Sequence, residues 1–386
     1  MLNIFKYIFL TLFIFLLTGC QEKIEKKPDI SKASLIKTHW NDLVGFEDDN
    51  LDKALSVFKK DCKARRVNKN LKDVCKKSFE FNDGKEFFTT YFEPFKLLNK
   101  RGNTNGLITG YYEPILNGSF EKTAKYKYPI YKTPKDLVTV RLSSIYPSLK
   151  KYTLRGKVVN NKLVPYEARK DLGKVSNKLE PLLYADNKVD KFFLEIQGSG
   201  KVKLPDGKVI NLAYAQQNGR KYYPIGRKLL RAGYIKKEDM SLQSIKKWCD
   251  DNPSRVDEVL NLNDSVVFFK ISKKTATGSL GVELVAKRNL AVDTSFIPLG
   301  FPVFINTTNP INKQKINSLM VAADTGGAIK GDVRADFFWG NGYEAKLNAG
   351  KMAQKGILTI LIPKELKKTK MWSDDTSKYL KVKVNP

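Results

Sequence analysis

Short apolar runs bounded by turn residues recur along most of the chain, and their spacing constrains the fold more than any other feature. Turns such as Pro205-Asp206-Gly207 separate these runs, and we predict that the runs form β-strands. The predicted strands lie at 107–112, 128–131, 192–197, 209–214, 265–271, 281–285, 302–306, 318–323 and 357–362. Many short strands at such intervals favour a barrel or a sandwich over a doubly wound parallel sheet.

Helical periodicity is confined to a few segments, which we expect to cover the β core. Apolar residues recur at helical spacing in 51–62 and 87–95, and shorter helices are predicted at 224–232, 242–248 and 344–354. The predicted fold class is therefore mainly β with a few covering helices. A chain of 386 residues with 42% hydrophobic residues has room for two domains, and its composition excludes a disordered protein.

The chain is strongly basic, with 69 Lys and Arg against 40 Asp and Glu and a formal net charge of +29. Such a surface attracts polyanions, for example nucleic acid, anionic lipid or an acidic cell-wall polymer. Only 12 of the 69 basic residues are Arg, the residue that phosphate and base recognition favour. The sequence therefore argues against a nucleic-acid partner.

The single histidine of the sequence, His39, excludes several classes of site. A Ser-His-Asp or Cys-His site would have to use His39, and no nucleophile motif such as G-x-S-x-G lies near it. His and Cys residues do not cluster as zinc ligands do, and the phosphate-binding pattern G-x-x-x-x-G-K-[ST] is absent from the sequence. We therefore predict no metal and no cofactor, with catalysis by carboxylates, tyrosines and backbone groups.

The N-terminus has the pattern of a secretory signal, because a basic start precedes a short apolar run at 7–17. This run is too short to span a membrane comfortably. It ends in Leu17-Thr18-Gly19-Cys20, which resembles a bacterial lipobox and implies cleavage before Cys20 and acylation of that residue. An uncleaved anchor helix is the alternative. We predict a signal peptide at 1–19, a lipidated tether at 20–35 and attachment to the periplasmic face of the outer membrane.

An oxidising compartment changes what the remaining cysteines are expected to do. Cys62 and Cys75 flank a basic, polar loop between two helical segments, so we predict a local disulfide between them. Cys249 follows Trp248 in a helical pattern and is predicted to be a buried thiol.

A glycine-rich turn lies between two aspartates near the C-terminal end. An apolar run delivers Asp324 to this turn, and Asp336 then stands beside Phe337-Phe338-Trp339. Aromatic packing and a second carboxylate both raise the pKa of a carboxyl group, so Asp336 could stay protonated and act as a proton donor. Alternatively both aspartates cap turns, or Lys330 pairs with Asp336 and lowers its pKa.

Two further stretches could bind a ligand. Thr109-Gly110-Tyr111-Tyr112-Glu113-Pro114 places paired tyrosines beside a glycine, which suits stacking on sugar rings, although one tyrosine in the core and one at the surface explains it equally well. In the stretch 192–200, an apolar run that we interpret as a buried strand leads from Phe192 to Gln197 and into Gly198-Ser199-Gly200. This end could form the wall of a groove or a simple turn.

Together these stretches resemble the membrane-bound lytic murein transglycosylase A family, including its C-terminal three-aspartate (3D) domain. The resemblance covers roughly residues 84–363 and departs from the family pattern at 261–264 and at Arg288-Asn289-Leu290. The matching stretches are 109–114, 192–200, 214–219 with 225–227, 266–269, 291–293 with 297–300, and 324–340. Each is weak alone, and their common order makes the resemblance specific.

The resemblance implies a double-psi β-barrel domain built from 36–113 and 265–386, interrupted by a smaller inserted β-domain at 114–264. The groove between the two domains would hold a glycan strand. The catalytic acid of the family corresponds to Asp336 and its supporting carboxylate to Asp324. The third aspartate corresponds to Asp293, expected to stabilise a turn of the barrel.

The activity implied is cleavage of the β-1,4 bond between N-acetylmuramic acid and N-acetylglucosamine in peptidoglycan, with formation of 1,6-anhydromuramic acid. Asp336 would act first as acid and then as base. Thr109, Tyr112 and Gln197 are candidate glycan contacts, and Glu113 and Lys330 are weaker ones. The expected partners are peptidoglycan and a membrane reached through Cys20, with the protein acting as a monomer or within a wall-synthesis complex.

Two other functions stay open at this point. An inverting polysaccharide hydrolase would use Asp324 to activate water, because such enzymes need two carboxyl groups. A non-catalytic wall-binding lipoprotein would need only the cationic surface.

Overall fold

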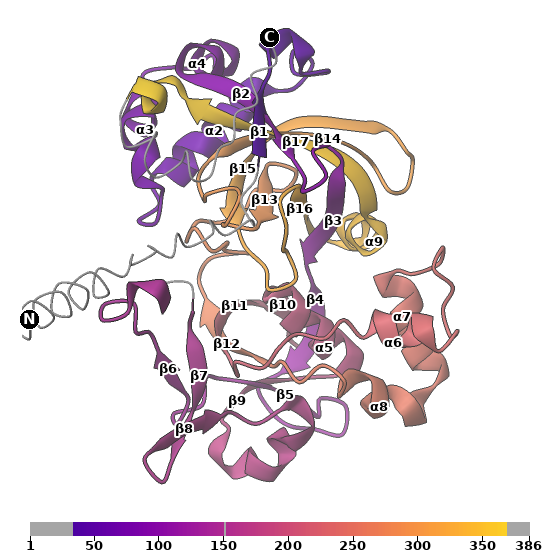
Figure 1. Ribbon diagram of the computed structural model, residues 1–386. Coiled ribbons are helices and arrows are strands. Elements are labelled where there is room, and N and C mark those ends of the chain that lie inside the picture. Colours follow the sequence, from indigo (N-terminus) through magenta and orange to yellow (C-terminus); the bar gives the residue numbers. More distant parts are fainter. Residues whose placement is uncertain (1–33, 150–151, 369–386) are drawn as a thin grey trace, which may run out of the picture. The chain divides into compact units, whose positions relative to one another are not determined.

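The computed structural model describes residues 34–149 and 152–368 (Figure 1). The predicted signal peptide, Cys20 and most of the tether lie outside the described residues. None of the described helices combines the length and the apolar character needed to cross a lipid bilayer.

The largest element of the fold is an eight-stranded sheet assembled from both ends of the chain. Its strand order is β1-β2-β17-β14-β15-β13-β16-β3, and an additional pairing joins β17 to β3. Most neighbours are antiparallel, but β13 runs parallel to β15 and β16 runs parallel to β3. The strands are β1 Ser34–Lys37, β2 Phe92–Leu98, β3 Gly106–Glu113, β13 Asn289–Val292, β14 Pro302–Thr308, β15 Lys315–Asp324, β16 Arg334–Asn341 and β17 Ala353–Pro363.

The middle of the chain forms two smaller sheets. A six-stranded sheet has the order β12-β11-β10-β4-β9-β5, and a three-stranded sheet has the order β6-β7-β8. Strand β12 begins beyond residue 264, where we expected the inserted domain to end, and yet it pairs with β11. The strands are β4 Ile115–Ser119, β5 Tyr128–Tyr131, β6 Val138–Val140, β7 Leu154–Val159, β8 Lys162–Pro165, β9 Pro181–Ala185, β10 Ser199–Lys203, β11 Val209–Gln217 and β12 Val267–Ser272.

Helices are short and lie between the strands, in agreement with the mainly β class predicted. The α-helices are α2 Leu51–Cys62, α3 Lys72–Ser78, α4 Gly84–Tyr91, α5 Lys188–Gln197, α6 Gly226–Arg231, α7 Leu242–Asp251, α8 Val256–Leu260 and α9 Tyr343–Lys351. The 3-10 helices are η1 Trp40–Asp42, η2 Lys69–Leu71, η3 Pro147–Leu149, η4 Arg169–Lys178, η5 Pro253–Arg255 and η6 Lys364–Lys368.

The prediction of a strand at 192–197 is wrong, because this run belongs to helix α5. The Asn187 side chain accepts hydrogen bonds from the backbone N–H groups of Val189 and Asp190 at the start of the helix. Gly198 ends the helix with a φ of 75°, a conformation that glycine adopts without strain. These two caps were readable in the sequence. The prediction of a turn at 205–207 is correct, but this turn joins β10 to β11 and does not follow a strand at 192–197.

Two other boundaries differ from the prediction. The helix expected at 87–95 ends at Tyr91, because Pro94 lacks an N–H group and disfavours a helical residue before it. The segment 281–285 is not a strand, and Thr277 and Glu283 form only an isolated bridge there. Gly281 has a φ of 91°, and its N–H donates to the Gly278 carbonyl in a tight turn.

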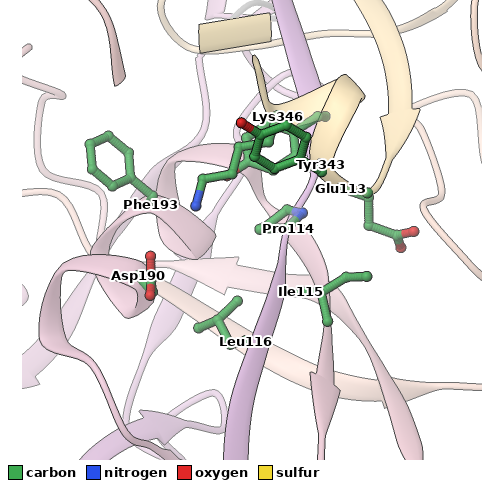
Figure 2. A pocket seen from close by; sticks show the side chains of 10 residues that line it. Glu113, Pro114, Ile115, Leu116, Asp190, Phe193, Tyr343 and Lys346 are labelled. Atoms are coloured by element: carbon green, nitrogen blue, oxygen red, sulfur yellow. The ribbon is translucent and has the colours of Figure 1, made fainter. Parts of the chain in front are cut away.

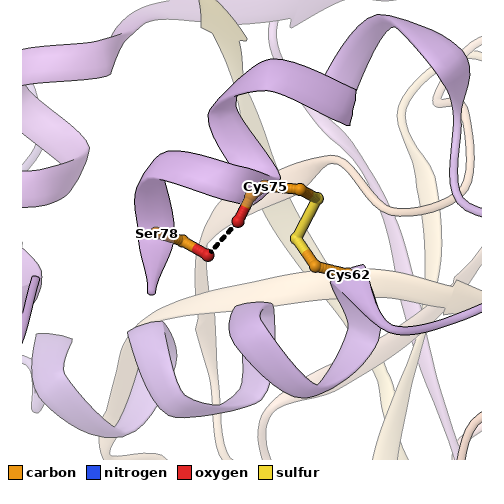
Figure 3. Close-up of a disulfide and its surroundings, with 3 residues drawn as sticks. All are labelled: Cys62, Cys75 and Ser78. Carbon is orange, nitrogen blue, oxygen red and sulfur yellow. Dashed lines mark hydrogen bonds between the residues drawn. A yellow bond between two sulfur atoms is a disulfide. The ribbon is translucent and has the colours of Figure 1, made fainter. Parts of the chain in front are cut away.

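Helices α2, α3 and α4 pack an aromatic cluster against the large sheet. Phe58 of α2 contacts Phe87 and Phe88 of α4 and Phe92 of β2, and all four rings are buried. A disulfide joins Cys62 at the end of α2 to Cys75 in α3, as predicted (Figure 3). Cys249 is a free, buried thiol, which also agrees with the sequence. The N-terminal helices are therefore tied to the sheet by packing and to each other by a covalent bond.

The buried carboxyl group of Asp61 makes stability depend on pH. Burial raises its pKa to about 6, against the opposing effects of Lys60 and Asn289. The folded pKa exceeds the unfolded value, so native stability is greatest while Asp61 is protonated and falls as pH rises from about 4 to about 6. For Asp61→Asn, we expect the free energy of unfolding relative to wild type to increase by about 3 kcal/mol between pH 3.5 and pH 7. Denaturant unfolding at both pH values measures this difference, and Asp48→Asn, a change at an exposed position, is the control.

Candidate active site

The candidate site is built on the parallel pair of strands β3 and β16, where Thr109 lies opposite Asp336. Side chains alternate between the two faces of a strand, so Asp336 and Phe338 share one face while Phe337 and Trp339 point into the core. Of the three aromatic residues expected beside Asp336, only Phe338 therefore shares its face. On β3, Thr109 and Tyr111 share this face, and the Tyr111 and Phe338 rings lie 5.0 Å apart.

The space around position 110, between Thr109 and Tyr111, admits only a glycine. A Cβ atom at this position would come within 2.7 Å of the Trp339 indole nitrogen and 2.9 Å of Ala349 Cα. Helix α9 packs against β3 and β16 here, so the glycine allows the helix to approach the strand that carries Thr109.

Asp336 receives a hydrogen bond from a hydroxyl group that is itself held by a cation. The Thr109 hydroxyl donates to Oδ1 of Asp336 at 2.6 Å, and an Arg334 guanidinium nitrogen donates to the Thr109 oxygen at 2.7 Å. Arginine can only donate, so the Thr109 hydrogen must point at Asp336. Oδ1 is thereby an acceptor, and a proton on this carboxyl group has to sit on Oδ2.

Asp324 ends β15 and is held by a turn that lies far away in the sequence. Its Oδ1 accepts hydrogen bonds from the Ser279 N–H at 2.8 Å, the Ser279 hydroxyl at 2.9 Å and the Thr325 N–H at 2.8 Å. Burial raises the pKa of Asp324, and these hydrogen bonds oppose that effect. Asp324 therefore has a fixed orientation and several partners that favour its charged form.

The two carboxyl groups influence each other. Burial raises the pKa of Asp336, Thr109 and Arg334 oppose this, and the negative charge of Asp324 raises it further. Tyr111 lies beside both groups, and burial followed by the charges of Asp324 and Asp336 raises the pKa of its hydroxyl. Asp336 is nevertheless partly exposed, so a ligand can reach it. This combination is typical of an acid that must hold its proton until a substrate arrives.

Comparison with known proteins identifies the family of the chain. The MltA-specific insert domain matches residues 107–270, and the 3D domain matches residues 288–362. The membrane-bound lytic murein transglycosylase A of Escherichia coli K12 is 34% identical over 265 residues, which are 67% of this chain and 66% of the relative. A crystal structure of MltA from Neisseria gonorrhoeae is 33% identical, with a TM-score of 0.73 over 85% of this chain and 92% of that chain. The chain belongs to the membrane-bound lytic murein transglycosylase A family.

A solved structure of MltA from E. coli is similar in fold and contains a ligand. The structure of E. coli MltA with bound chitohexaose is 25% identical, with a TM-score of 0.65 over 86% of this chain and 94% of that chain. The predicted family is thus confirmed by sequence and by structure.

The other residues that the family resemblance indicated occupy different surroundings. Tyr112 is buried on the opposite face of β3 from Asp336, and its backbone N–H donates to Oε1 of Gln197 at 3.1 Å. Glu113 is buried and pairs with Lys201 at 3.4 Å. Lys330 is exposed in the glycine-rich turn, and no ion pair between Lys330 and Asp336 occurs in the described structure.

Tyr112 and Glu113 instead line a cavity of about 200 Å³ at the junction of β3 and β4 (Figure 2). Phe193 and Asp190 of α5 and Lys346 of α9 complete part of its wall. Neither Asp336 nor Asp324 contributes to this cavity. In residues 34–149 and 152–368, no three His, Cys, Asp or Glu side chains are grouped as a metal site.

Asp293 holds the glycine-rich turn in place. Its Oδ1 accepts from the Ser295 N–H and its Oδ2 from the Gly331 N–H, both at 3.0 Å. The side chain is buried, so it connects the end of β13 to the loop between the two candidate catalytic residues. This supports the turn-stabilising role expected for it.

Sequence reasoning missed Arg334, Ser279 and the contribution of Tyr111. Arg334 is two residues from Asp336, a spacing that places both on one face of a strand, so the sequence contained a signal for it. Nothing in the sequence indicated that Ser279 would reach Asp324, because 45 residues separate them.

Arg334 should set the pH range over which Asp336 stays protonated. Its positive charge lowers the pKa of Asp336, so Arg334→Met should raise that pKa. An acid is active below its pKa, and we expect the alkaline limb of the rate profile to move up by on the order of one pH unit. Turbidity loss of sacculi across pH measures this shift. Arg334→Lys keeps the charge and should leave the limb near its wild-type position, whereas a downward shift in Arg334→Met would contradict the assignment.

Proposed function

We propose that the protein is a lytic transglycosylase of peptidoglycan, which cleaves the bond between N-acetylmuramic acid and N-acetylglucosamine without water. The observation that carries this proposal is the partly exposed Asp336, whose pKa is raised and whose Oδ1 is occupied by Thr109. Family membership supports the substrate, and so does the chitohexaose bound to the E. coli relative, because chitohexaose is a β-1,4-linked glycan.

The proton belongs on Asp336 and the negative charge on Asp324. Asp324 accepts three hydrogen bonds through Oδ1, whereas Asp336 accepts one, so the charged form is better stabilised at Asp324. Two neighbouring carboxylates repel each other, and this favours a proton on the second one.

The reaction then uses one carboxyl group twice. Asp336 Oδ2 gives its proton to the glycosidic oxygen as the bond from C1 to that oxygen breaks, and N-acetylglucosamine leaves. The C6 hydroxyl of the muramic residue attacks C1 and returns its proton to Asp336. The product is 1,6-anhydromuramic acid, and the acid is regenerated. An intramolecular nucleophile makes a second, water-activating carboxylate unnecessary.

The neighbouring side chains have supporting roles in this mechanism. Thr109 orients Asp336, and the charge of Asp324 stabilises the oxocarbenium-like transition state and holds the proton on Asp336. Gln197, Tyr112, Glu113 and Lys330 stay predicted glycan contacts. Tyr111 joins them, because its ring lies on the same face as Asp336.

The finer domain organisation belongs to the same proposal. The pairing of β17 with β3 supports a closed double-psi β-barrel built from 36–113 and 265–386. The six-stranded sheet supports an inserted β-domain at 114–264, to which β12 adds residues 267–272. Residues 1–19 would be the signal peptide and 20–35 the tether, with acylated Cys20 holding the enzyme at the periplasmic face of the outer membrane.

The products of digested sacculi test the reaction. We expect muropeptides that end in 1,6-anhydromuramic acid, a loss of one water relative to the hydrolysed product, which mass spectrometry detects. Borohydride reduces only free reducing ends, so anhydro products stay unreduced. Reducible ends as the main product would instead indicate the inverting hydrolase, with Asp324 activating water.

A further inference from the structure

The three-stranded sheet of β6, β7 and β8 has one wholly apolar face. In the β-ladder, Val140 pairs with Leu154 and Val158 with Leu163. Gly156 pairs with Val138 on one side and with Pro165 on the other. Paired residues share a face, so these seven residues, which we call the β6–β8 apolar face, lie together.

The opposite face of this sheet is mostly polar, although it includes Val159 and Val164, and part of it packs against the rest of the chain. Arg155 Nε donates to Oε1 of Gln216 at 2.6 Å, and the Gln216 amide donates to the Thr139 hydroxyl at 3.0 Å. Lys157 forms an ion pair with Glu167. An antiparallel sheet normally packs its apolar side inward and leaves its polar side to water. Here the polarity is reversed, and this arrangement indicates that the outward side meets something apolar.

Large side chains of the apolar face are exposed to solvent. Leu154 is 54% exposed, Val158 57% and Leu163 40%. In the connection between β6 and β7, Ile145 is 69% exposed and Tyr152 is 63% exposed. Aliphatic side chains gathered in this way mark an interaction surface.

The charged side chains of the segment that carries the apolar face are all basic. The sequence contains no acidic residue between Asp136 and Glu167, and Arg141 and Lys162 are exposed within this segment. Basic side chains beside exposed aliphatic residues and tyrosines are typical of segments that lie at the surface of an anionic membrane.

We propose that the β6–β8 apolar face docks on an anionic phospholipid surface. Its aliphatic residues enter the interface between headgroups and acyl chains. The long side chains of Arg141, which follows β6, and of Lys162, which begins β8, reach the phosphates from the ends of the strands. A second copy of this chain fits poorly, because two molecules of net charge +29 repel each other. A glycan fits poorly as well, because Leu154, Val158 and Leu163 offer no hydrogen bonds to sugar hydroxyls.

The test places a fluorophore on the face of the full-length protein. V158C labelled with an environment-sensitive dye is mixed with vesicles of phosphatidylethanolamine and phosphatidylglycerol that carry brominated acyl chains. V209C is the matched control, since Val209 of β11 is 51% exposed and lies on another sheet. Cys62 and Cys75 are bonded and Cys249 is buried, and protein without an added cysteine gives the background.

We expect the bromine atoms to quench the dye at 158 at least about twofold more than the dye at 209. R141E/K162E or phosphatidylcholine vesicles should remove most of that difference. Equal quenching at positions 158 and 209 overturns the proposal. Quenching at 158 that is the same with anionic and with phosphatidylcholine vesicles overturns it as well. A blue shift of the dye's emission in the absence of vesicles also overturns the proposal. A shift that grows with protein concentration would indicate that a second copy covers the face. A shift that does not depend on concentration would indicate that a segment of the same chain covers it. A shift that needs sacculi instead of vesicles would assign the face to the cell wall.

Discussion

Asp336→Asn is expected to abolish the release of anhydromuropeptides from sacculi, with a loss of about a thousandfold or more in rate. The amide cannot give a proton to the glycosidic oxygen, and general acid catalysis of this kind contributes on the order of 100- to 10,000-fold. Asn keeps an oxygen that can accept from Thr109, so the fold and the groove should be retained. Quantifying anhydro products by mass spectrometry measures the effect.

A pulldown on sacculi provides the control for Asp336→Asn. The variant should still bind sacculi and unfold at the same denaturant concentration as wild type, which separates lost chemistry from lost structure. Undiminished product release would remove Asp336 from the reaction. Loss of both binding and folding would assign Asp336 a structural role.

The second large effect is expected on stability, at the buried ion pair between Arg169 and Glu195. Arg169 donates to Glu195 at 2.6 Å and to the Asn263 and Ser265 carbonyls at 2.9 and 2.5 Å. Burial alone would raise the pKa of Glu195, but Arg169 and Lys191 outweigh it and lower that pKa. Arg169→Met leaves a buried charge short of a partner, and we expect a loss of about 3–5 kcal/mol in the free energy of unfolding.

Denaturant unfolding measures this loss, and two comparisons define its cause. Lys247→Met removes an exposed ion pair with Asp251 and should leave stability close to that of the wild type. Adding Glu195→Leu to Arg169→Met removes the stranded charge and should recover part of the loss. An Arg169→Met protein as stable as the Lys247→Met protein would show that the ion pair contributes little.

Much of the fold was readable from local patterns. The strands at 107–112, 209–214 and 302–306 and the helix at 51–62 follow from periods of two and of 3.6 residues. The error at 192–197 arose because a short apolar run fits a buried strand and a buried helix equally well. There the caps Asn187 and Gly198 decided the structure, and Pro94 likewise ended α4 early.

The candidate site likewise combines features that local sequence patterns predict with contacts between residues that are far apart in the sequence. The sequence by itself determined the mainly β class and the family and indicated the two candidate aspartates, because these depend on composition and on motifs of consecutive residues. Only the tertiary structure decided two contacts. Arg334 donates to Thr109, which is 225 residues away in the sequence and holds Asp336, and Ser279 orients Asp324. The physical reason is that a hydrogen bond depends on two atoms approaching within about 3 Å, and strand pairing sets that approach between residues that no local pattern connects.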